Sequence, residues 1–239
     1  DLENAIGDNT VAVHYYAVEQ DIDPNALPLE DTIEIAHAKG VKVTVDAAGQ
    51  IYPLENFGKY VRMGADFQCI AAKYMGASQS TGLALGTTEM IRHIGYQSFV
   101  GYEGRRIRGV GRPQKVDRQE MIGVVAATKR WFTMNHEERL AAVETQSQNM
   151  MAPLKGIPGL KAVMLENIIG HQPFGVEIEV DEAVAGMSAQ EIVDKLKAGD
   201  PPVWTRVRDG ESNIVLHGFG LSEGQDKIVG ARIAELFGR

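Results

Sequence analysis

The sequence predicts an α/β fold in two parts, a mainly parallel sheet followed by a small α+β domain at the C-terminal end. Two apolar runs, residues 41–45 and 67–72, are joined by a segment of helical length that ends at Gly64. This strand–helix–strand order makes the two strands parallel. After the segment rich in proline and glycine at 153–159, short strands and helices alternate. That order predicts a small antiparallel sheet covered on one side by helices.

Apolar periodicity and turn residues place the elements of the first half. Pro28 at its start and Gly40 at its end bound a helix. In chain order we expect a strand at 10–18, a turn at 21–25, a helix at 28–39, buried strands at 41–45 and 67–72, and another buried strand at 83–86.

The middle of the chain has two kinds of pattern. Residues 93–115 contain many Gly and Arg and lack a clean periodicity, which predicts a partly ordered loop. Residues 117–149 follow a helical pattern, and Asp117 with Glu120 forms a capping box at its start. The length predicts two helices, or one bent helix, that bridge the domains.

The C-terminal elements complete the predicted organisation. Ser188 and Glu191 form a second capping box. We expect strands at 161–167, 175–180, 203–208 and 213–218, and helices at 188–197 and 222–237. The predicted domains are the back part of a large domain at 1–115, bridging helices at 116–152, and a small α+β domain at 153–239.

Composition limits the function classes. The chain has 239 residues, 44% of them hydrophobic, and a net charge of −8, which disfavours a nucleic-acid surface. No stretch is apolar and long enough to span a bilayer, so no membrane contact is expected. The single cysteine, Cys69, excludes an intramolecular disulfide and suits a reducing, cytoplasmic compartment. Because Cys69 lies inside a strand, we expect its side chain to be buried and to pack as a small apolar group.

The histidines do not indicate a metal site. The chain has six, at 14, 37, 93, 136, 171 and 217, and none stands at metal-ligand spacing. His14 lies inside an apolar strand, so we expect a core histidine. His37 lies late in a helix, where a partial positive charge is mildly favourable.

Two polar residues follow the parallel strands. Asp46 ends the first strand and Lys73 follows the second, so both emerge at the same carboxyl edge of the sheet, where open α/β sheets bind ligands. An Asp there is often a helix cap, and a Lys there is often a solvated loop residue. A carboxylate and an amine together are also what pyridoxal phosphate (PLP) requires. The amine forms a Schiff base, and the carboxylate keeps the pyridine nitrogen protonated.

Four ordered motifs carry a family resemblance. They are Val-Asp-Ala-Ala at 45–48, Gly-Ala-Asp at 64–66 with Lys73 and the small-residue segment 76–82, Gly-Arg-Pro-Gln-Lys-Val at 111–116, and Gly-Asp-Pro-Pro at 199–202 leading to Arg206. The sequence resembles the fold-type I PLP enzymes of the selenocysteine synthase and D-glucosaminate-6-phosphate ammonia-lyase group. The resemblance covers the back half of the large domain and the small domain. We expect the N-terminal portion, with its phosphate-binding loop, to lie outside this sequence.

The resemblance implies roles for particular residues. Lys73 is the catalytic Schiff-base lysine and Asp46 the partner of the pyridine nitrogen. Ala48 is small enough for the ring to approach, and Gln50 is either a partner of its phenolic oxygen or solvent-facing. Many relatives carry Ser or Thr just before the lysine. Here those positions are Ile70 and Ala71, so the phosphate contact is expected elsewhere. The candidates are Ser78, Ser80 and Thr81.

Three cationic residues are candidate substrate ligands. Arg112 and Lys115 lie on the predicted loop, where they either contact an anion or are surface charges. Arg206 matches the arginine that clamps a substrate carboxylate in related enzymes. Arg208, two residues on, is its competitor.

The resemblance implies a PLP enzyme acting on an amino acid or amino sugar acid. The substrate would form an external aldimine and lose its α-proton. We expect a lyase that carries out elimination or deamination, in a homo-oligomer. The alternatives are a transferase like seryl-tRNA selenium transferase, for which the acidic composition offers no basic surface, and a truncated, non-catalytic homologue that serves in assembly.

Overall fold

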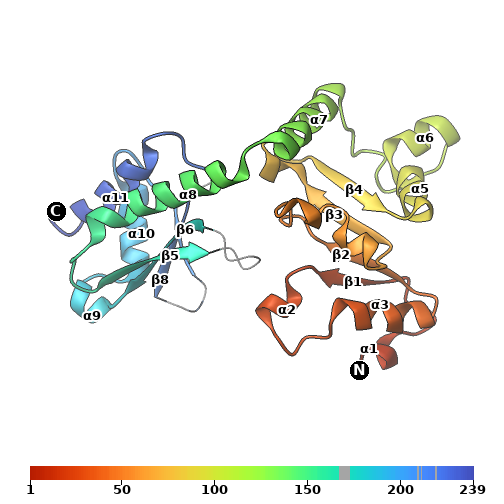
Figure 1. Cartoon of the computed structure of the whole chain (residues 1–239), viewed down its shortest axis with the longest axis horizontal. Helices are drawn as coiled ribbons and strands as arrows, with labels where there is room; N and C mark the ends of the chain where they lie inside the picture. Colours follow the sequence, from red (N-terminus) through yellow and green to blue (C-terminus); the bar gives the residue numbers. More distant parts are fainter. Residues whose placement is uncertain (167–172, 209, 211, 219) are drawn as a thin grey trace. The chain divides into compact units, whose positions relative to one another are not determined.

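The computed structural model describes residues 1–166, 173–208, 210, 212–218 and 220–239. The chain forms two compact units, Asp1–Met134 and Asn135–Arg239 (Figure 1). This division falls inside the segment predicted to hold bridging helices, and the predicted domain boundaries stay predictions. His171 and the last residue of the strand predicted at 161–167 lie outside the described residues.

The first unit contains the mostly parallel sheet that the sequence predicts. Its strands are β1 (Ala12–Tyr16), β2 (Lys42–Asp46), β3 (Phe67–Ala71) and β4 (Gly82–Gly86), in that spatial order. β1, β2 and β3 run parallel, and β4 pairs antiparallel with β3. The register places Asp46 directly opposite Cys69. The prediction that the strand at 83–86 is buried is wrong, because the side chains of β4 are exposed or partly buried.

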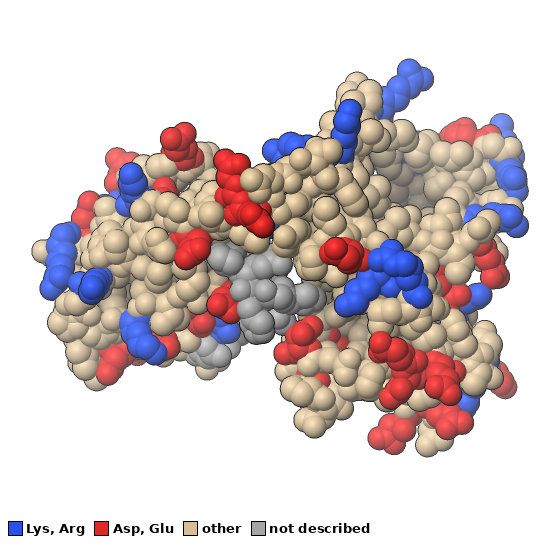
Figure 2. All heavy atoms as spheres, viewed as in Figure 1, with Lys and Arg blue, Asp and Glu red and all other residues tan. Residues whose placement is uncertain are grey.

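One face of this sheet is buried. Helix α3 (Leu29–Ala38) directs Ile33 and Ala36 toward Val43 and Val45 of β2. Two short helices, α1 (Leu2–Ala5) and α2 (Glu19–Ile22), complete this part of the unit. Acidic side chains gather on the surface where α3 lies (Figure 2). The apolar face of α3 is therefore turned to the sheet and its acidic face to solvent.

The opposite face of the sheet is exposed or half-buried. Tyr16 of β1, Thr44 and Asp46 of β2, and Cys69 of β3 lie on it. His14 also lies on this face, exposed, with its Nδ1 2.9 Å from Thr44 Oγ1. The prediction that His14 lies in the core is therefore wrong. In a period-two strand, position 14 falls on the opposite face from the buried Tyr15.

The segment between β2 and β3 differs from the prediction. It holds two short turns of helix, η1 (Leu54–Asn56) and α4 (Lys59–Arg62), rather than one helix. Gly58 separates them in a left-handed conformation, with φ of +73°. The parallel pairing of β2 and β3 is unaffected, because it needs only a crossover of sufficient length.

Asp66, at the start of β3, anchors the other end of these strands. Its buried carboxylate accepts hydrogen bonds from the Val43 N–H at 2.9 Å and from His37 Nε2 at 2.8 Å. Lys42 Nζ lies 3.1 Å from its second oxygen. Burial raises the pKa of Asp66, but these three partners outweigh burial and the net pKa is lowered. These contacts give a structural role to Asp66, the aspartate of the Gly-Ala-Asp motif, and to His37, which binds it.

The first half of the predicted loop at 93–115 is helical. Helices α5 (Thr88–Gln97) and α6 (Phe99–Arg105) cover it as far as residue 105, and residues 106–115 lie outside the helices. Thr87 caps α5 by accepting a hydrogen bond from the Met90 N–H at 3.2 Å. Several glycines and arginines weaken the periodic signal of these helices, which explains why the sequence pattern missed them.

Of the two predicted alternatives, two helices or one bent helix, the structure has two helices. They are α7 (Arg118–Thr133) and α8 (His136–Met151). The predicted capping box of Asp117 and Glu120 is present. Asn135 caps α8, accepting hydrogen bonds from the N–H groups of Glu137 and Glu138. A new helix start at Asn135 therefore separates them.

The second unit is the small α+β domain. Its antiparallel sheet has the order β5 (Leu160–Glu166), β6 (Pro173–Val180), β8 (Asn213–His217) and β7 (Arg206–Val207). α8, α10 (Ala189–Ala198) and α11 (Gln225–Glu235) cover one face, while η3 (Ala152–Leu154) and α9 (Glu182–Ala185) lie in the connections. The strand predicted at 203–208 shrinks to two residues, and the last helix begins at Gln225 rather than at 222.

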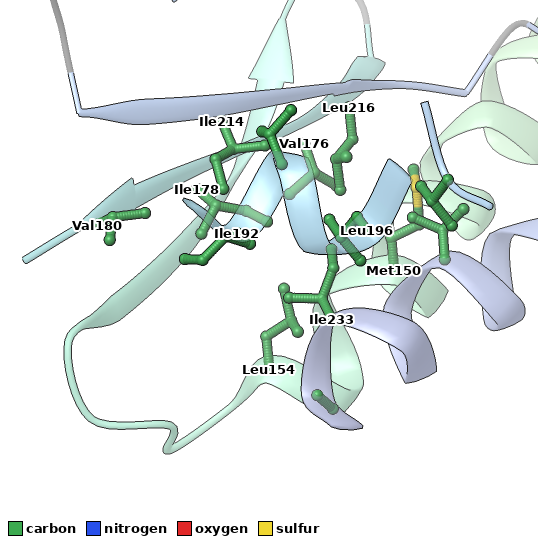
Figure 3. Packing of buried hydrophobic residues seen from close by; sticks show 14 of the residues in the cluster. Met150, Leu154, Val176, Ile178, Val180, Ile192, Leu196, Ile214, Leu216 and Ile233 are labelled. Atoms are coloured by element: carbon green, nitrogen blue, oxygen red, sulfur yellow. The ribbon is translucent and has the colours of Figure 1, made fainter. Parts of the chain in front are cut away.

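Helix and sheet side chains meet in one continuous core. Ile178 and Ile214 of the sheet face Ile192 of α10 and Ile233 of α11, and all four are fully buried (Figure 3). Ser188 and Glu191 form the predicted capping box of α10. Among the described helices of both units, none has the length and hydropathy needed to cross a membrane.

Candidate active site

Asp46 stands at the carboxyl end of β2 with its side chain held from two sides. Its Oδ1 accepts a hydrogen bond from the Ala48 N–H at 3.0 Å and from Cys69 Sγ at 3.3 Å. The strand register brings Cys69 into place, because it lies opposite Asp46. Among the described residues, both donors meet the same oxygen, which leaves Oδ2 available to a ligand.

Cys69 differs from the prediction of a buried apolar residue. It is partly exposed, and burial, followed by the neighbouring Asp46 carboxylate, raises the pKa of its thiol. The thiol therefore stays protonated at neutral pH and donates its proton toward Asp46. A cysteine twenty-three positions away in sequence can be assigned this role only when the register is known.

Lys73 lies just beyond β3, in the helical turn η2 (Ala72–Met75). Its side chain is exposed, and Nζ lies 5.2 Å from the centre of the Tyr74 ring. The Ala71 N–H donates to the Ala48 carbonyl at 3.0 Å, which joins the lysine segment to the Asp46 turn. Asp46 and Lys73 therefore emerge at one edge of the sheet.

Helix α7 supports both the segment after Asp46 and the lysine segment from within the same unit. Trp131 Nε1 donates to the Ile51 carbonyl at 2.8 Å, and Arg130 Nη2 donates to the Met75 carbonyl at 3.1 Å. Gly76 follows with φ of +93°, and a Cβ at this position would lie 2.9 Å from Arg130 Nη2. Sequence reasoning missed Arg130 and Trp131, because no local pattern connects α7 to a loop more than fifty residues earlier.

Two further candidates lie at the same edge. Gln50 is half-buried in the turn after Asp46, and its N–H donates to the Ala47 carbonyl at 3.0 Å. Ser78 is exposed in the turn after Lys73, which the Thr81 N–H closes by donating to the Ser78 carbonyl at 3.1 Å. Their position is compatible with cofactor contacts.

The remaining candidates are elsewhere. Arg112 Nη2 lies 2.9 Å and Lys115 Nζ 3.7 Å from Glu103 Oε1 of α6, so one carboxylate balances both. Arg206 belongs to the second unit, where it opens β7 and is exposed. Its competitor Arg208 is ion-paired, with Nε 3.2 Å from Glu177 Oε1.

The residues at the sheet edge fit PLP better than a metal. The described residues contain no group of three or more His, Cys, Asp or Glu side chains able to hold a metal ion. A carboxylate with one oxygen available and an exposed amine fit the pyridine nitrogen and the aldehyde of PLP.

Comparison with known proteins identifies relatives with several reactions. No family model matches the chain. It is 27% identical over 180 residues to a 5'-C-glycyluridine monooxygenase-decarboxylase of Streptomyces, covering 75% of this chain and 42% of that protein. It is 22% identical over 236 residues to the D-glucosaminate-6-phosphate ammonia lyase of Salmonella typhimurium, covering 98% and 59%. With the L-seryl-tRNA(Sec) selenium transferase of Aquifex aeolicus, identity is 24% over 232 residues, covering 88% and 50%.

Solved structures agree on the fold. A D-glucosaminate-6-phosphate ammonia-lyase matches 99% of this chain with a TM-score of 0.72 and 21% identity, and the match covers 61% of that chain. A serine palmitoyltransferase from S. paucimobilis, solved with a bound PLP–myriocin aldimine, matches 98% of this chain and 57% of its own with a TM-score of 0.54 and 13% identity.

The matches confirm the predicted fold and relationship. The chain has the fold of the fold-type I PLP-dependent enzymes and is related to the ammonia-lyase and selenium-transferase group. It spans about half the length of the curated relatives that it matches, between 42% and 59%.

Proposed function

We propose that this chain is the lysine- and aspartate-bearing part of a PLP-dependent enzyme that acts on a small amino acid or amino sugar acid. One observation carries the proposal: Asp46 and Lys73 emerge at the same sheet edge, joined by the Ala71–Ala48 hydrogen bond. If Lys73 were only a solvated loop residue, it would not need a carboxylate such as Asp46 at the same edge of the sheet. The reaction we favour is a lyase reaction, by elimination or deamination.

The chain's residues have separate roles at this edge. Bound PLP supplies an electron sink for the pair released when a bond to the substrate α-carbon breaks. Asp46 Oδ2 would accept a hydrogen bond from the protonated pyridine nitrogen, and its negative charge would favour the cationic ring. Lys73 Nζ would hold the cofactor through its aldehyde, and the amine, once free, would serve as the base for the α-proton. Ala48 and Gln50 would border the ring, and Ser78 would contact the phosphate.

Substrate anions are assigned to the cationic residues. We assign Arg206 to the substrate carboxylate, because Arg208 is engaged with Glu177 while the described residues include no acidic partner for Arg206. Arg112 and Lys115 remain candidates for a second substrate anion. Because they share Glu103, such an anion must compete with that carboxylate.

The relatives support the cofactor more than the reaction. Their names describe an ammonia lyase, a selenium transferase and a monooxygenase-decarboxylase. A transferase acting on a charged tRNA remains the second proposal, although a net charge of −8 does not favour RNA contact. A non-catalytic assembly partner is the third. We also propose a homo-oligomer and a cytoplasmic location.

The test is PLP trapping on the purified chain. An absorption spectrum with added PLP, followed by borohydride reduction and peptide mapping, should show PLP covalently attached to Lys73. Lys73→Ala should abolish the adduct and lower any activity by at least about 10³-fold. Lys59→Ala, which removes another exposed lysine of the first unit, is the matched control and should keep both. Without an adduct on Lys73, the non-catalytic alternative would gain support.

A further inference from the structure

A pocket lies within the second unit, around the start of β7. It has a volume of about 580 Å³, which suits a small molecule. Most of its lining is apolar, and Trp204, Thr205, Arg206, His217 and Gln225 contribute its aromatic and polar groups. Arg206 is the residue assigned above to a substrate carboxylate. The other groups have no role in that assignment.

Trp204 is exposed but held in place. Its relative exposure is 74%, unusually high for so large an apolar side chain. Lys197 Nζ of α10 lies 4.3 Å from its ring centre, a cation–π contact. The neighbouring residues are also fixed, since the Val203 N–H donates to the Leu196 carbonyl at 2.9 Å and Thr205 Oγ1 donates to the Val215 carbonyl at 2.6 Å. The indole is therefore a preformed wall of the pocket.

The polar groups of the pocket define what it can bind. Arg206 supplies a positive charge, and no Asp or Glu is among the described lining residues. Burial, and then the charges of Arg206 and Arg208, lower the pKa of His217, so this imidazole is neutral at pH 7 and contributes hydrogen bonding only. Gln225 adds an amide. The pocket thus matches an anion joined to a body that has hydroxyl groups and one apolar face.

We propose that Trp204 is a specificity-determining residue. Its indole contacts the C–H face of a polyhydroxylated carbon chain whose carboxylate pairs with Arg206. A sugar acid has this combination, whereas a short amino acid places only its carboxylate in the pocket. This inference rests on the proposed function for its substrate, since it names the sugar-acid class over short amino acids.

The first experiment needs no cofactor. D-gluconate is the probe, with acetate and glycerol as controls that each lack one of its two features. Acrylamide quenching of tryptophan fluorescence reports on Trp204. A Trp204→Phe variant supplies the signal of the other tryptophan, the buried Trp131. We expect gluconate to protect Trp204 from quenching at concentrations where acetate and glycerol do not. Arg206→Gln should remove the protection.

Two results would overturn the proposal. Equal protection by acetate would show that the carboxylate alone is bound. If Trp204 is protected from quenching without ligand, and this protection increases with protein concentration, a second copy of the chain covers the pocket. Because this readout uses no PLP, it stands or falls separately from adduct formation on Lys73.

The second experiment uses the holoenzyme. Trp204→Ala should raise KM for a polyhydroxylated amino acid about tenfold with kcat little changed, and leave KM for serine unchanged. Trp204→Phe should recover part of the loss. Lys197→Gln should give a smaller increase than Trp204→Ala, and Lys195→Gln on the same helix should give none. An equal rise in KM for both substrates would contradict a role in specificity.

Discussion

The two units differ most in the face of each sheet that is turned away from its core. In the second unit, that face carries charged pairs, such as Lys161 with Glu179 and Arg208 with Glu177. In the first unit, the corresponding face carries Lys42, which is ion-paired at the start of β2, and then Tyr16, Thr44, Cys69 and Asp46 toward the carboxyl end, where Asp46 has no ion-pair partner among the described residues. Antiparallel sheets commonly expose one polar face, whereas parallel sheets are ordinarily covered on both.

This difference separates a structural surface from a surface suited to ligands. Ion pairs across an antiparallel sheet satisfy one another and need no further partner. The face of the first unit has a carboxylate with only one oxygen engaged by the described residues, beside side chains that are small or aromatic. Asp46, the candidate cofactor carboxylate, therefore lies on the sheet face whose polar side chains are least engaged by hydrogen bonds and ion pairs within their own unit.

The largest effect should come from the core of the second unit. Ile192 is fully buried in α10, so Ile192→Ala should lower the free energy of unfolding by about 3 kcal/mol. Hydrogen exchange should speed up in β5, β6 and β8 and stay unchanged in β1, β2 and β3. Val184→Ala at an exposed position of α9 is the control and should cost less than about 0.5 kcal/mol. Faster exchange in both units would show that their stabilities are coupled.

An intermediate effect should come from the anchor of the first unit. Asp66→Asn removes the charge that Lys42 and His37 face, and should cost about 2 kcal/mol at pH 7. The pKa of Asp66 is lowered in the folded state, so its contribution is fully present above its ordinary value of 3.8. The contribution is lost as pH falls through the lower, folded value.

Denaturant unfolding at several pH values checks this sign. The difference between the wild type and the Asp66→Asn variant should be present above pH 5 and shrink as the pH falls below the ordinary pKa of 3.8. A difference that grows as the pH falls below 3.8 would contradict the assigned direction.

The smallest effect should come from the thiol beside Asp46. Cys69→Ala removes one donor from Oδ1 but leaves the Ala48 N–H, so PLP binding should weaken only about two- to fivefold. Cys69→Ser keeps a donor and should restore binding. A titration of PLP into each variant measures this, and stronger binding by the alanine variant would contradict a supporting role.

The chain's single cysteine offers a direct check of the same contact. Because burial and the Asp46 carboxylate raise the pKa of the thiol, alkylation by iodoacetamide should be slow at pH 7. Asp46→Asn removes the negative charge and should move the alkylation profile toward lower pH. An unchanged profile would mean that Asp46 has no influence on Cys69.

Local signals made much of the fold predictable. Apolar runs bounded by glycine located β2 and β3, and the side-chain pattern of a capping box located the starts of α7 and α10 at Asp117 and Ser188. Helices α5 and α6 were missed because glycine and arginine blurred their periodicity. His14 was misplaced because an apolar strand does not by itself indicate which face is covered.

By itself, the sequence determined the order of the strands along the chain, and it placed Asp46 and Lys73 at one sheet edge, because parallel strands end on the same side. Only the tertiary structure decided which groups hold the site residues in place: Cys69 against Asp46 through the strand register, Trp131 against the Ile51 carbonyl after the Asp46 turn, and Arg130 against the lysine segment. The same holds for Lys197 against Trp204 in the second unit. The reason is physical. Periodicity and caps act over a few neighbouring residues, whereas these contacts join residues that only strand pairing and core packing bring together.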